Sequence, residues 1–165
     1  MSPDVRPVLD AGLILRTLIA RGVDFVVIGG IAAVLHGSPR NTFDLDISFA
    51  TDSANLTALG DVLIDLESRL RGVPDEVPFV PDAATLKNIE VLTLRTRAGD
   101  LDVLAYPAGA PAYAELRDGA DRYEIDEVTI RVASIDHLIA MKSAAGRDKD
   151  ISDIAELQAI VRLRG

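Results

Sequence analysis

The sequence predicts an α/β domain in which a mixed β-sheet is flanked by helices and followed by a C-terminal helical pair. Short apolar runs typical of buried strands alternate with segments that carry apolar residues at helical spacing. Two hairpin signals follow in the second half of the chain, and two helical segments end it. The 165 residues, 48% of them hydrophobic, suffice for one core. We therefore expect an α/β core over residues 1–133 and a C-terminal helical segment over residues 134–165, packed on the same domain.

In the N-terminal half, amphipathic stretches predict helices and apolar stretches predict strands. A short helical segment follows Gly29-Gly30, and the next helix can be capped by Asp52 or Ser53. The predicted helices cover residues 8–21, 31–35 and about 53–71, and the predicted strands cover residues 25–28 and 43–49.

In the C-terminal half, a loop with three prolines precedes two hairpin patterns and two helices. On the last helix, we expect the apolar side chains at 151, 154, 157, 160 and 161 to face inward. Lys149 and Asp153 have i,i+4 spacing, which predicts a pair on the helix surface. The predicted segments are a loop over residues 72–81, strands over residues 89–96, 101–105, 123–125 and 128–132, and helices over residues 113–117, 134–145 and 148–164.

Composition excludes several kinds of chemistry. The chain has no cysteine, which excludes disulfides, thiolate catalysis and Cys-based zinc sites. Its two histidines, His36 and His137, are far apart in sequence, and we expect His36 to be structural. A formal net charge of −9 argues against broad binding to nucleic acid but is compatible with a local basic patch. With no signal-like leader and no apolar run that could cross a bilayer, we expect a soluble, cytoplasmic protein without membrane contact.

The strongest indication of function is the aspartate pair Asp44 and Asp46. They lie one residue apart in a predicted strand, so both carboxylates point to one face of the sheet. Such carboxylates repel each other and lose solvation, and a divalent cation with oxygen ligands would offset both effects. Solvated carboxylates at a strand end are the alternative. Asp102, inside a later predicted strand, is the candidate third ligand, whereas we expect Asp100 to cap a turn or stay solvated.

Four further residues are candidates for binding phosphate. Gly29 and Gly30 join a strand to a helix, where free N–H groups can face an anion, although a plain tight turn is the alternative. Arg40 lies in the loop before the aspartates and is either a phosphate ligand or a surface arginine. Lys142 is a solvated lysine unless its helix faces the same site. The G-x-G-x-x-G pattern of dinucleotide-binding Rossmann domains is absent.

The order of these motifs resembles the nucleotidyltransferase superfamily that includes DNA polymerase β. In that family a Gly-Gly or Gly-Ser pair at a helix start precedes D-x-D or D-x-E, and a third Asp lies on a following strand. This chain has Gly29-Gly30, Asp44-Leu45-Asp46 and Asp102 in that order. Its segment over residues 142–153 is similar to the K-x-x-A-x-R-x-K-D-x-x-D segment of small bacterial members related to the AbiEii abortive-infection toxins.

The resemblance implies transfer of a nucleoside monophosphate from an NTP to a hydroxyl acceptor, with pyrophosphate as the leaving group. It implies two Mg²⁺ ions held by carboxylates, with the third aspartate also helping to activate the acceptor hydroxyl. The acceptor could be RNA, a protein or a small molecule, and a toxin role would imply an antitoxin partner. The implied catalytic and metal-binding residues are Asp44, Asp46 and Asp102, and the implied nucleotide-binding residues are Gly29, Gly30, Arg40 and Lys142.

Two features depart from the family pattern. Many members carry Ser where this chain has Gly30, so here only a backbone N–H faces the terminal phosphate. The part of the chain after Ser134 is also short for the toxin family. The alternative function is a non-catalytic nucleotide-binding or interaction module on the same fold, against which the three retained carboxylates argue.

Overall fold

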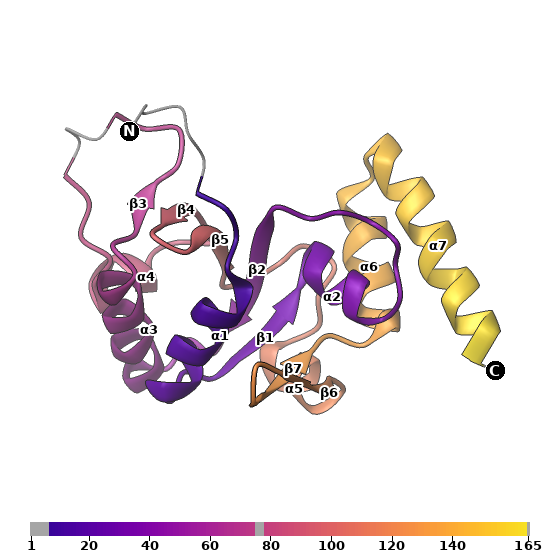
Figure 1. The fold of residues 1–165 in the computed structure, drawn as a ribbon, viewed down its shortest axis with the longest axis horizontal. Helices are drawn as coiled ribbons and strands as arrows, with labels where there is room; N and C mark the ends of the chain where they lie inside the picture. The colour runs from indigo at the N-terminus through magenta and orange to yellow at the C-terminus, as the bar shows by residue number, and fades with distance from the viewer. Residues whose placement is uncertain (1–6, 75–77, 165) are drawn as a thin grey trace.

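The centre of the molecule is a seven-stranded mixed β-sheet with the strand order β3-β4-β5-β2-β1-β7-β6 (Figure 1). The computed structural model of the protein describes residues 7–74 and 78–164. Strand β2 is parallel to β5 and antiparallel to β1, and β1 is parallel to β7. The strands are β1 (Phe25–Ile28), β2 (Asp44–Phe49), β3 (Arg69–Leu70), β4 (Val91–Thr96), β5 (Gly99–Leu104), β6 (Asp121–Ile125) and β7 (Val128–Val132).

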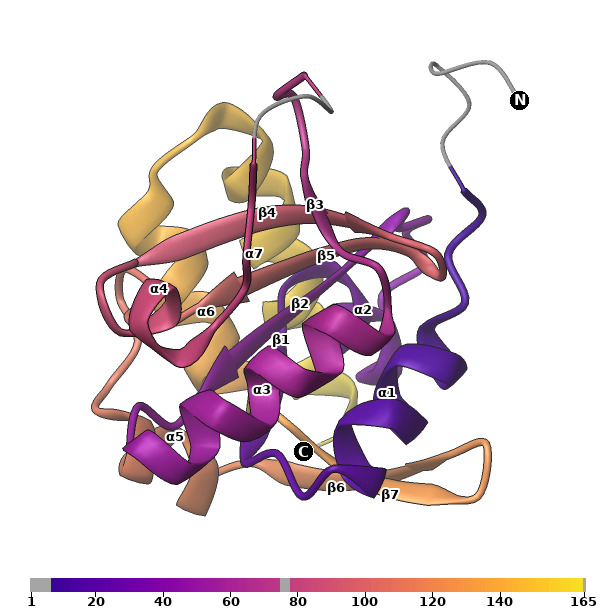
Figure 2. The ribbon, with the colours of Figure 1, turned by 90° about the vertical axis from the view of Figure 1, so that its left-hand side faces the viewer.

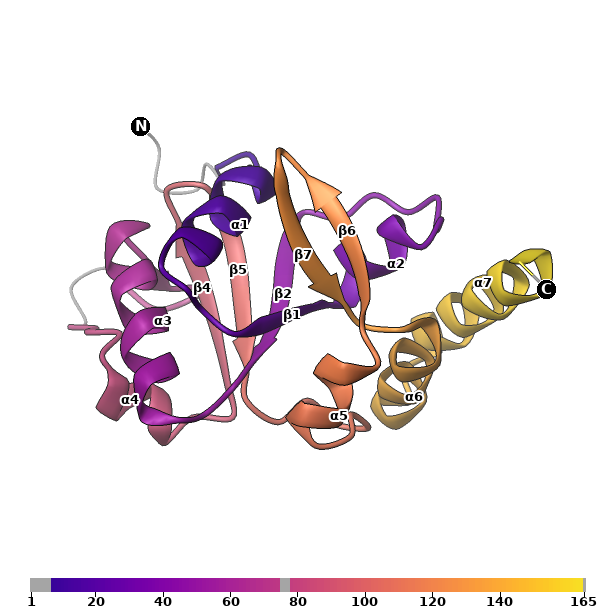
Figure 3. The ribbon, with the colours of Figure 1, turned by 90° about the horizontal axis from the view of Figure 1, so that it is seen from below.

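Helices lie on both sides of this sheet. Helices α1 and α3 cover one face, whereas α6 and α7 lie on the opposite side (Figure 2). The β6–β7 hairpin lies beside β1, and α6 and α7 are at the end of the molecule remote from α3 and α4 (Figure 3). The helices are α1 (Ala11–Ala20), α2 (Gly29–Leu35), α3 (Ser53–Asp65), α4 (Ala83–Lys87), α5 (Tyr113–Asp118), α6 (Ile135–Ala145) and α7 (Asp148–Arg164).

The core explains why the central strands carry continuous apolar runs. All four residues of β1 are buried, as expected for a strand covered on both faces. On β2, Leu45 and Ile47 are fully buried, while Asp44 and Asp46, which alternate with them, are half-buried on the other face. Leu15 and Leu18 of α1 and Leu59 and Leu63 of α3 complete this core and have no exposed surface. The predicted mixed α/β fold with flanking and C-terminal helices is thus confirmed.

The predicted helix over residues 53–71 is too long. Helix α3 ends at Asp65, and Glu67 adopts a positive φ of 54° that a helix does not continue. Arg69 and Leu70 then form strand β3, which pairs with Arg95 and Leu94 of β4. The helical spacing of apolar residues continues past the end of α3, because Leu66 still packs in the core although it lies beyond the helix.

Two expectations about single side chains are also wrong. Asp100 neither caps the turn nor stays solvated, because the turn is the two residues between Thr96 and Gly99, and Asp100 is only 1% exposed within β5. On α7, Ile151 is 70% exposed, and the buried residues of the helix are Asp150, Asp153 and Leu157.

No helix in the described part of the chain is both long and apolar enough to cross a membrane.

Candidate active site

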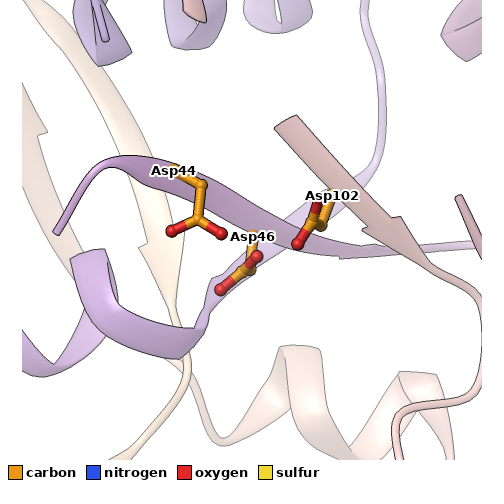
Figure 4. A group of neighbouring side chains, drawn as sticks. All are labelled: Asp44, Asp46 and Asp102. Atoms are coloured by element: carbon orange, nitrogen blue, oxygen red, sulfur yellow. The ribbon is translucent and has the colours of Figure 1, made fainter. Parts of the chain in front are cut away.

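Three carboxylates converge where β2 and β5 lie side by side. The two strands are parallel, with Asp44 opposite Asp100 and Asp46 opposite Asp102. Alternation along β2 puts Asp44 and Asp46 on one face, and the register brings Asp102 beside Asp46 on that same face. Each of the three half-buried side chains offers an oxygen within 4.8 Å of the others (Figure 4). We call Asp44, Asp46 and Asp102 the acidic triad.

The acidic triad is electrostatically crowded. Burial, followed by the charges of Asp44 and Asp102, raises the pKa of Asp46 to about 8. Burial also raises the pKa of Asp102, and the nearby guanidinium of Arg71 opposes that rise. A set of oxygen ligands that retains a proton near neutral pH suits a hard divalent cation, because such an ion replaces the proton and neutralises the repulsion. The residues present therefore fit a site for a hard divalent cation such as Mg²⁺.

Glycine at position 29 is required by the acidic triad. Its φ is +69°, and a Cβ built there would lie 2.0 Å from Asp46 Oδ2. The turn from β1 into α2 can pass against the aspartate only because Gly29 has no side chain. Helix α2 starts at this turn, and its N-cap Ile28 supplies no side-chain hydrogen bond to the first N–H groups.

Gly30 faces Thr42, which the sequence did not single out. A Cβ at Gly30 would lie 2.8 Å from Thr42 Oγ1 and 3.2 Å from its Cβ. The Thr42 hydroxyl donates a 3.2 Å hydrogen bond to the carbonyl of Asp44. A serine at position 30 would therefore require Thr42 to move, and in this chain the Thr42 hydroxyl lies beside the start of α2.

The acidic triad opens into a pocket of about 540 Å³. One wall is formed by the glycines at the start of α2 and by residues 40–42, and α6 contributes Leu138, Met141 and Lys142. Leu104, two residues after Asp102 on β5, and its partner Val91 on β4 add apolar surface to the lining. A separate hollow of about 400 Å³ beside β3 is lined by no member of the acidic triad, so the triad belongs to the larger pocket alone.

The two predicted phosphate-binding cations line this pocket but are paired with acids of α7. Lys142 Nζ lies 2.8 Å from Asp153 Oδ2 and 3.6 Å from Asp150 Oδ1. Arg40 contacts the other oxygen of Asp153, although the two groups are not aligned for a hydrogen bond. The predicted surface pair of Lys149 with Asp153 is therefore wrong, because Asp153 is 3% exposed and faces Lys142.

Arg147 forms the second half of this ion-pair cluster. Its guanidinium donates hydrogen bonds of 2.8 and 3.2 Å to the two oxygens of Asp150. The hydrogen bond from Arg147 lowers the pKa of Asp150 to about 2. His36 lies elsewhere, 3% exposed, and its ring Nε2 is 2.8 Å from the carbonyl of Ala133, in keeping with a structural histidine.

Sequence patterns also missed Arg71, whose side chain contacts a carboxylate of the acidic triad. Arg71 Nη2 donates a 2.9 Å hydrogen bond to Asp102 Oδ1. Arg71 was expected to end a helix, and no local pattern marks a residue whose partner lies 31 positions away. A charged residue directly before a proline-containing loop is the sole feature that sets it apart in the sequence.

The fold of this chain is similar to the folds of several solved nucleotidyltransferase structures. The structure of the lincosamide antibiotic adenylyltransferase LnuA with bound lincomycin matches with a TM-score of 0.60 at 19% identity, over 93% of this chain and 99% of that one. ANT(2″)-Ia in complex with adenylyl-2″-tobramycin matches with a TM-score of 0.54 at 18% identity, over 92% and 90% of the two chains. An antigenic nucleotidyltransferase-like protein from Paracoccidioides brasiliensis matches with a TM-score of 0.53 at 19% identity, over 95% and 78%.

At these identities the similarity establishes the fold alone. No family model matches the chain, and no curated protein matches its sequence. The protein therefore has a nucleotidyltransferase-like fold, with an acidic triad on its central strands.

Proposed function

We propose that the protein is a metal-dependent nucleotidyltransferase that moves a nucleoside monophosphate from an NTP to a hydroxyl acceptor. The observation that carries this proposal is the convergence of Asp44, Asp46 and Asp102 within 4.8 Å, beside the start of α2. The nucleotidyltransferase-like fold supports the same class of reaction. Proximity and charge neutralisation supply most of the catalysis of phosphoryl transfer, and the acidic triad with a bound cation would supply both.

In the proposed reaction the acceptor oxygen attacks the α-phosphorus of the NTP. The new O–P bond forms as the bond from the α-phosphorus to the bridging oxygen breaks, and pyrophosphate leaves. The proton of the acceptor hydroxyl passes to the Asp102 carboxylate. Two Mg²⁺ ions bound to the acidic triad would supply the positive charge that stabilises the entering and leaving oxygens.

The triphosphate would lie along the wall opposite Asp102. Backbone N–H groups of Gly29 and Gly30 would bind phosphate oxygens, with the Thr42 hydroxyl beside them. Arg40 and Lys142 would supply positive charge, and Lys142 belongs to α6. In this proposal the core over residues 1–133 carries the metal site, and the helical segment over residues 134–165 completes the nucleotide pocket. The need for an NTP implies a cytoplasmic reaction.

For the acceptor we propose a small molecule with a hydroxyl group. Val91 and Leu104 add apolar surface beside Asp102, and two proteins of similar fold are LnuA with bound lincomycin and ANT(2″)-Ia in complex with adenylyl-2″-tobramycin. The second candidate is a toxin of a toxin–antitoxin pair that modifies RNA or a protein. That candidate is favoured by the segment over residues 142–153, whose Lys142, Arg147, Asp150 and Asp153 form one ion-pair cluster.

The test is incubation with Mg²⁺ and each labelled NTP, in the presence of an aminoglycoside, a lincosamide or tRNA. We expect Mg²⁺-dependent release of pyrophosphate and transfer of label to one acceptor. The matched control is Asp44→Asn, which should abolish transfer without lowering the melting temperature, because it removes a repulsive charge.

A wild-type protein that binds no NTP with Mg²⁺ would overturn the proposal. Binding without transfer to any acceptor would instead favour a non-catalytic nucleotide-binding module. A sharp drop in the melting temperature of Asp44→Asn would assign that side chain a structural role.

A further inference from the structure

Arg71 lies in the same row of the sheet as two members of the acidic triad. Its backbone N–H donates a 2.9 Å hydrogen bond to the carbonyl of Thr93, which continues the pairing of β3 with β4. Thr93 is opposite Asp102, and Asp102 is opposite Asp46. The row therefore runs Asp46, Asp102, Thr93 and Arg71 across four neighbouring chain segments. The long arginine side chain reaches over β4 to the carboxylate on β5.

The guanidinium of Arg71 is fixed by several acceptors. Nη2 donates to Asp102 Oδ1 at 2.9 Å, and Nη1 lies 3.5 Å from Asp100 Oδ2 and 3.4 Å from the carbonyl oxygen of Leu94. The side chain is 23% exposed, and Asp100 is almost fully buried. Because the guanidinium also contacts Asp100 and the carbonyl of Leu94, it cannot move freely with Asp102. Its hydrogen bond therefore restrains the Asp102 carboxylate.

This contact determines how Asp102 faces the rest of the acidic triad. One oxygen of Asp102 accepts from Arg71, and one is directed toward Asp46 (Figure 4). The positive charge also offsets the repulsion among three carboxylates in the absence of a cation. The same charge lies close to the place where a divalent cation would bind, and it opposes that cation.

We propose that Arg71 is a positioning residue, which holds Asp102 in its reactive orientation and weakens cation binding at the acidic triad. This inference rests on the proposed function for its catalytic half, and on the metal-site geometry alone for its binding half. It assigns to Arg71 two effects of opposite sign. If Arg71 merely supported the fold, its substitution would reduce both cation binding and turnover.

The experiment replaces Arg71 by methionine and measures two quantities. Titration with Mn²⁺ alone, followed by electron paramagnetic resonance, should show binding that is roughly threefold to tenfold tighter than in the wild type. Turnover at saturating NTP and Mg²⁺ should fall by about ten- to hundredfold, because Asp102 loses its fixed orientation. The KM for the NTP should stay within about twofold, since the triphosphate wall is formed by other elements.

Two further variants separate charge from geometry. Arg71→Lys keeps the charge without the planar fork, so we expect wild-type affinity for Mn²⁺ and reduced turnover. Arg95→Met removes an arginine from the adjacent strand β4. The Nε of Arg95 lies 3.4 Å from Asp100 Oδ1, and Asp100 is not a member of the acidic triad. This matched control should leave both turnover and Mn²⁺ affinity close to wild type.

Weaker or unchanged binding of Mn²⁺ by Arg71→Met would overturn the inference, as would unchanged turnover. If Arg71→Met does not fold, Arg71→Lys still decides, because full turnover in that variant contradicts a geometric role. If the wild type binds Mn²⁺ but transfers nothing, the proposed function fails, and the Mn²⁺ affinities of the three variants still test the binding half.

Discussion

At Gly29 the backbone passes close to the carboxylate of Asp46, a member of the acidic triad. The positive φ and the 2.0 Å approach of a Cβ to Asp46 Oδ2 are independent reasons for glycine there. We expect Gly29→Ala to lower the free energy of unfolding by about 2–4 kcal/mol and to weaken cation binding, because it adds a clash to the backbone strain. Urea denaturation and Mn²⁺ titration measure the two effects.

Gly22→Ala is the matched control. Gly22 has nearly the same φ, +71°, but nothing lies within 4 Å of its Cβ position. Its substitution should lower stability by about 1 kcal/mol and leave cation binding unchanged. Equal losses in the two variants would show that strain, and not the approach to Asp46, explains position 29.

The raised pKa of Asp46 makes the metal-free protein sensitive to pH. Burial lifts this pKa from 3.8 to about 8, so between these values the folded protein holds a proton that the unfolded chain has released. Stability from this group is therefore present below about pH 4 and lost as the pH rises to about 8. In EDTA, Asp46→Asn should melt with a flatter dependence on pH than the wild type. Parallel melting curves for the two proteins across this range would contradict the assignment.

Mg²⁺ must displace the same proton, which predicts the opposite trend for the metal-bound protein. The stabilisation by Mg²⁺ should increase as the pH rises toward about 8, because the ionised form of Asp46 becomes more populated. Differential scanning calorimetry with and without Mg²⁺ at several pH values measures it. A stabilisation independent of pH would place the cation away from Asp46.

Helix α7 buries two charged residues and one apolar residue. Its buried residues are Asp150, Asp153 and Leu157. Both aspartates form ion pairs with basic side chains at the edge of the pocket. The segment over residues 142–153 therefore links α6, α7 and the loop that carries Arg40. Since Lys142 and Arg40 share Asp153, its carboxylate determines where both cations lie.

We expect Asp153→Asn to lower the free energy of unfolding by about 1–3 kcal/mol, because it leaves Lys142 and Arg40 without their shared charge. Asp148→Asn removes the same charge from the exposed first turn of α7 and should change stability by no more than about 0.5 kcal/mol. Urea denaturation of both variants provides the comparison. Equal effects would mean that the buried ion pairs do not hold α7.

For the whole molecule, local patterns predicted most of the elements. The strand at Asp44 to Phe49, the β6–β7 hairpin and the helix capped by Ser134 all follow from alternation, turn signals and capping, which act between residues a few positions apart. The two-residue strand β3 was missed because it is defined by its partner β4, more than twenty positions away in the chain.

The acidic triad shows the same division. Asp44 and Asp46 must share a face in any strand, because side chains alternate along it, and the sequence alone sufficed for that statement. Whether Asp102 joins them depends on the register of β5 against β2, and the contact of Arg71 with Asp102 depends on β3 as well. Register is a property of paired strands, and ion pairs such as Lys142 with Asp153 depend on how helices pack. For that reason the ligand types could be predicted from the chain, whereas the residues that orient and neutralise them emerged from the folded structure.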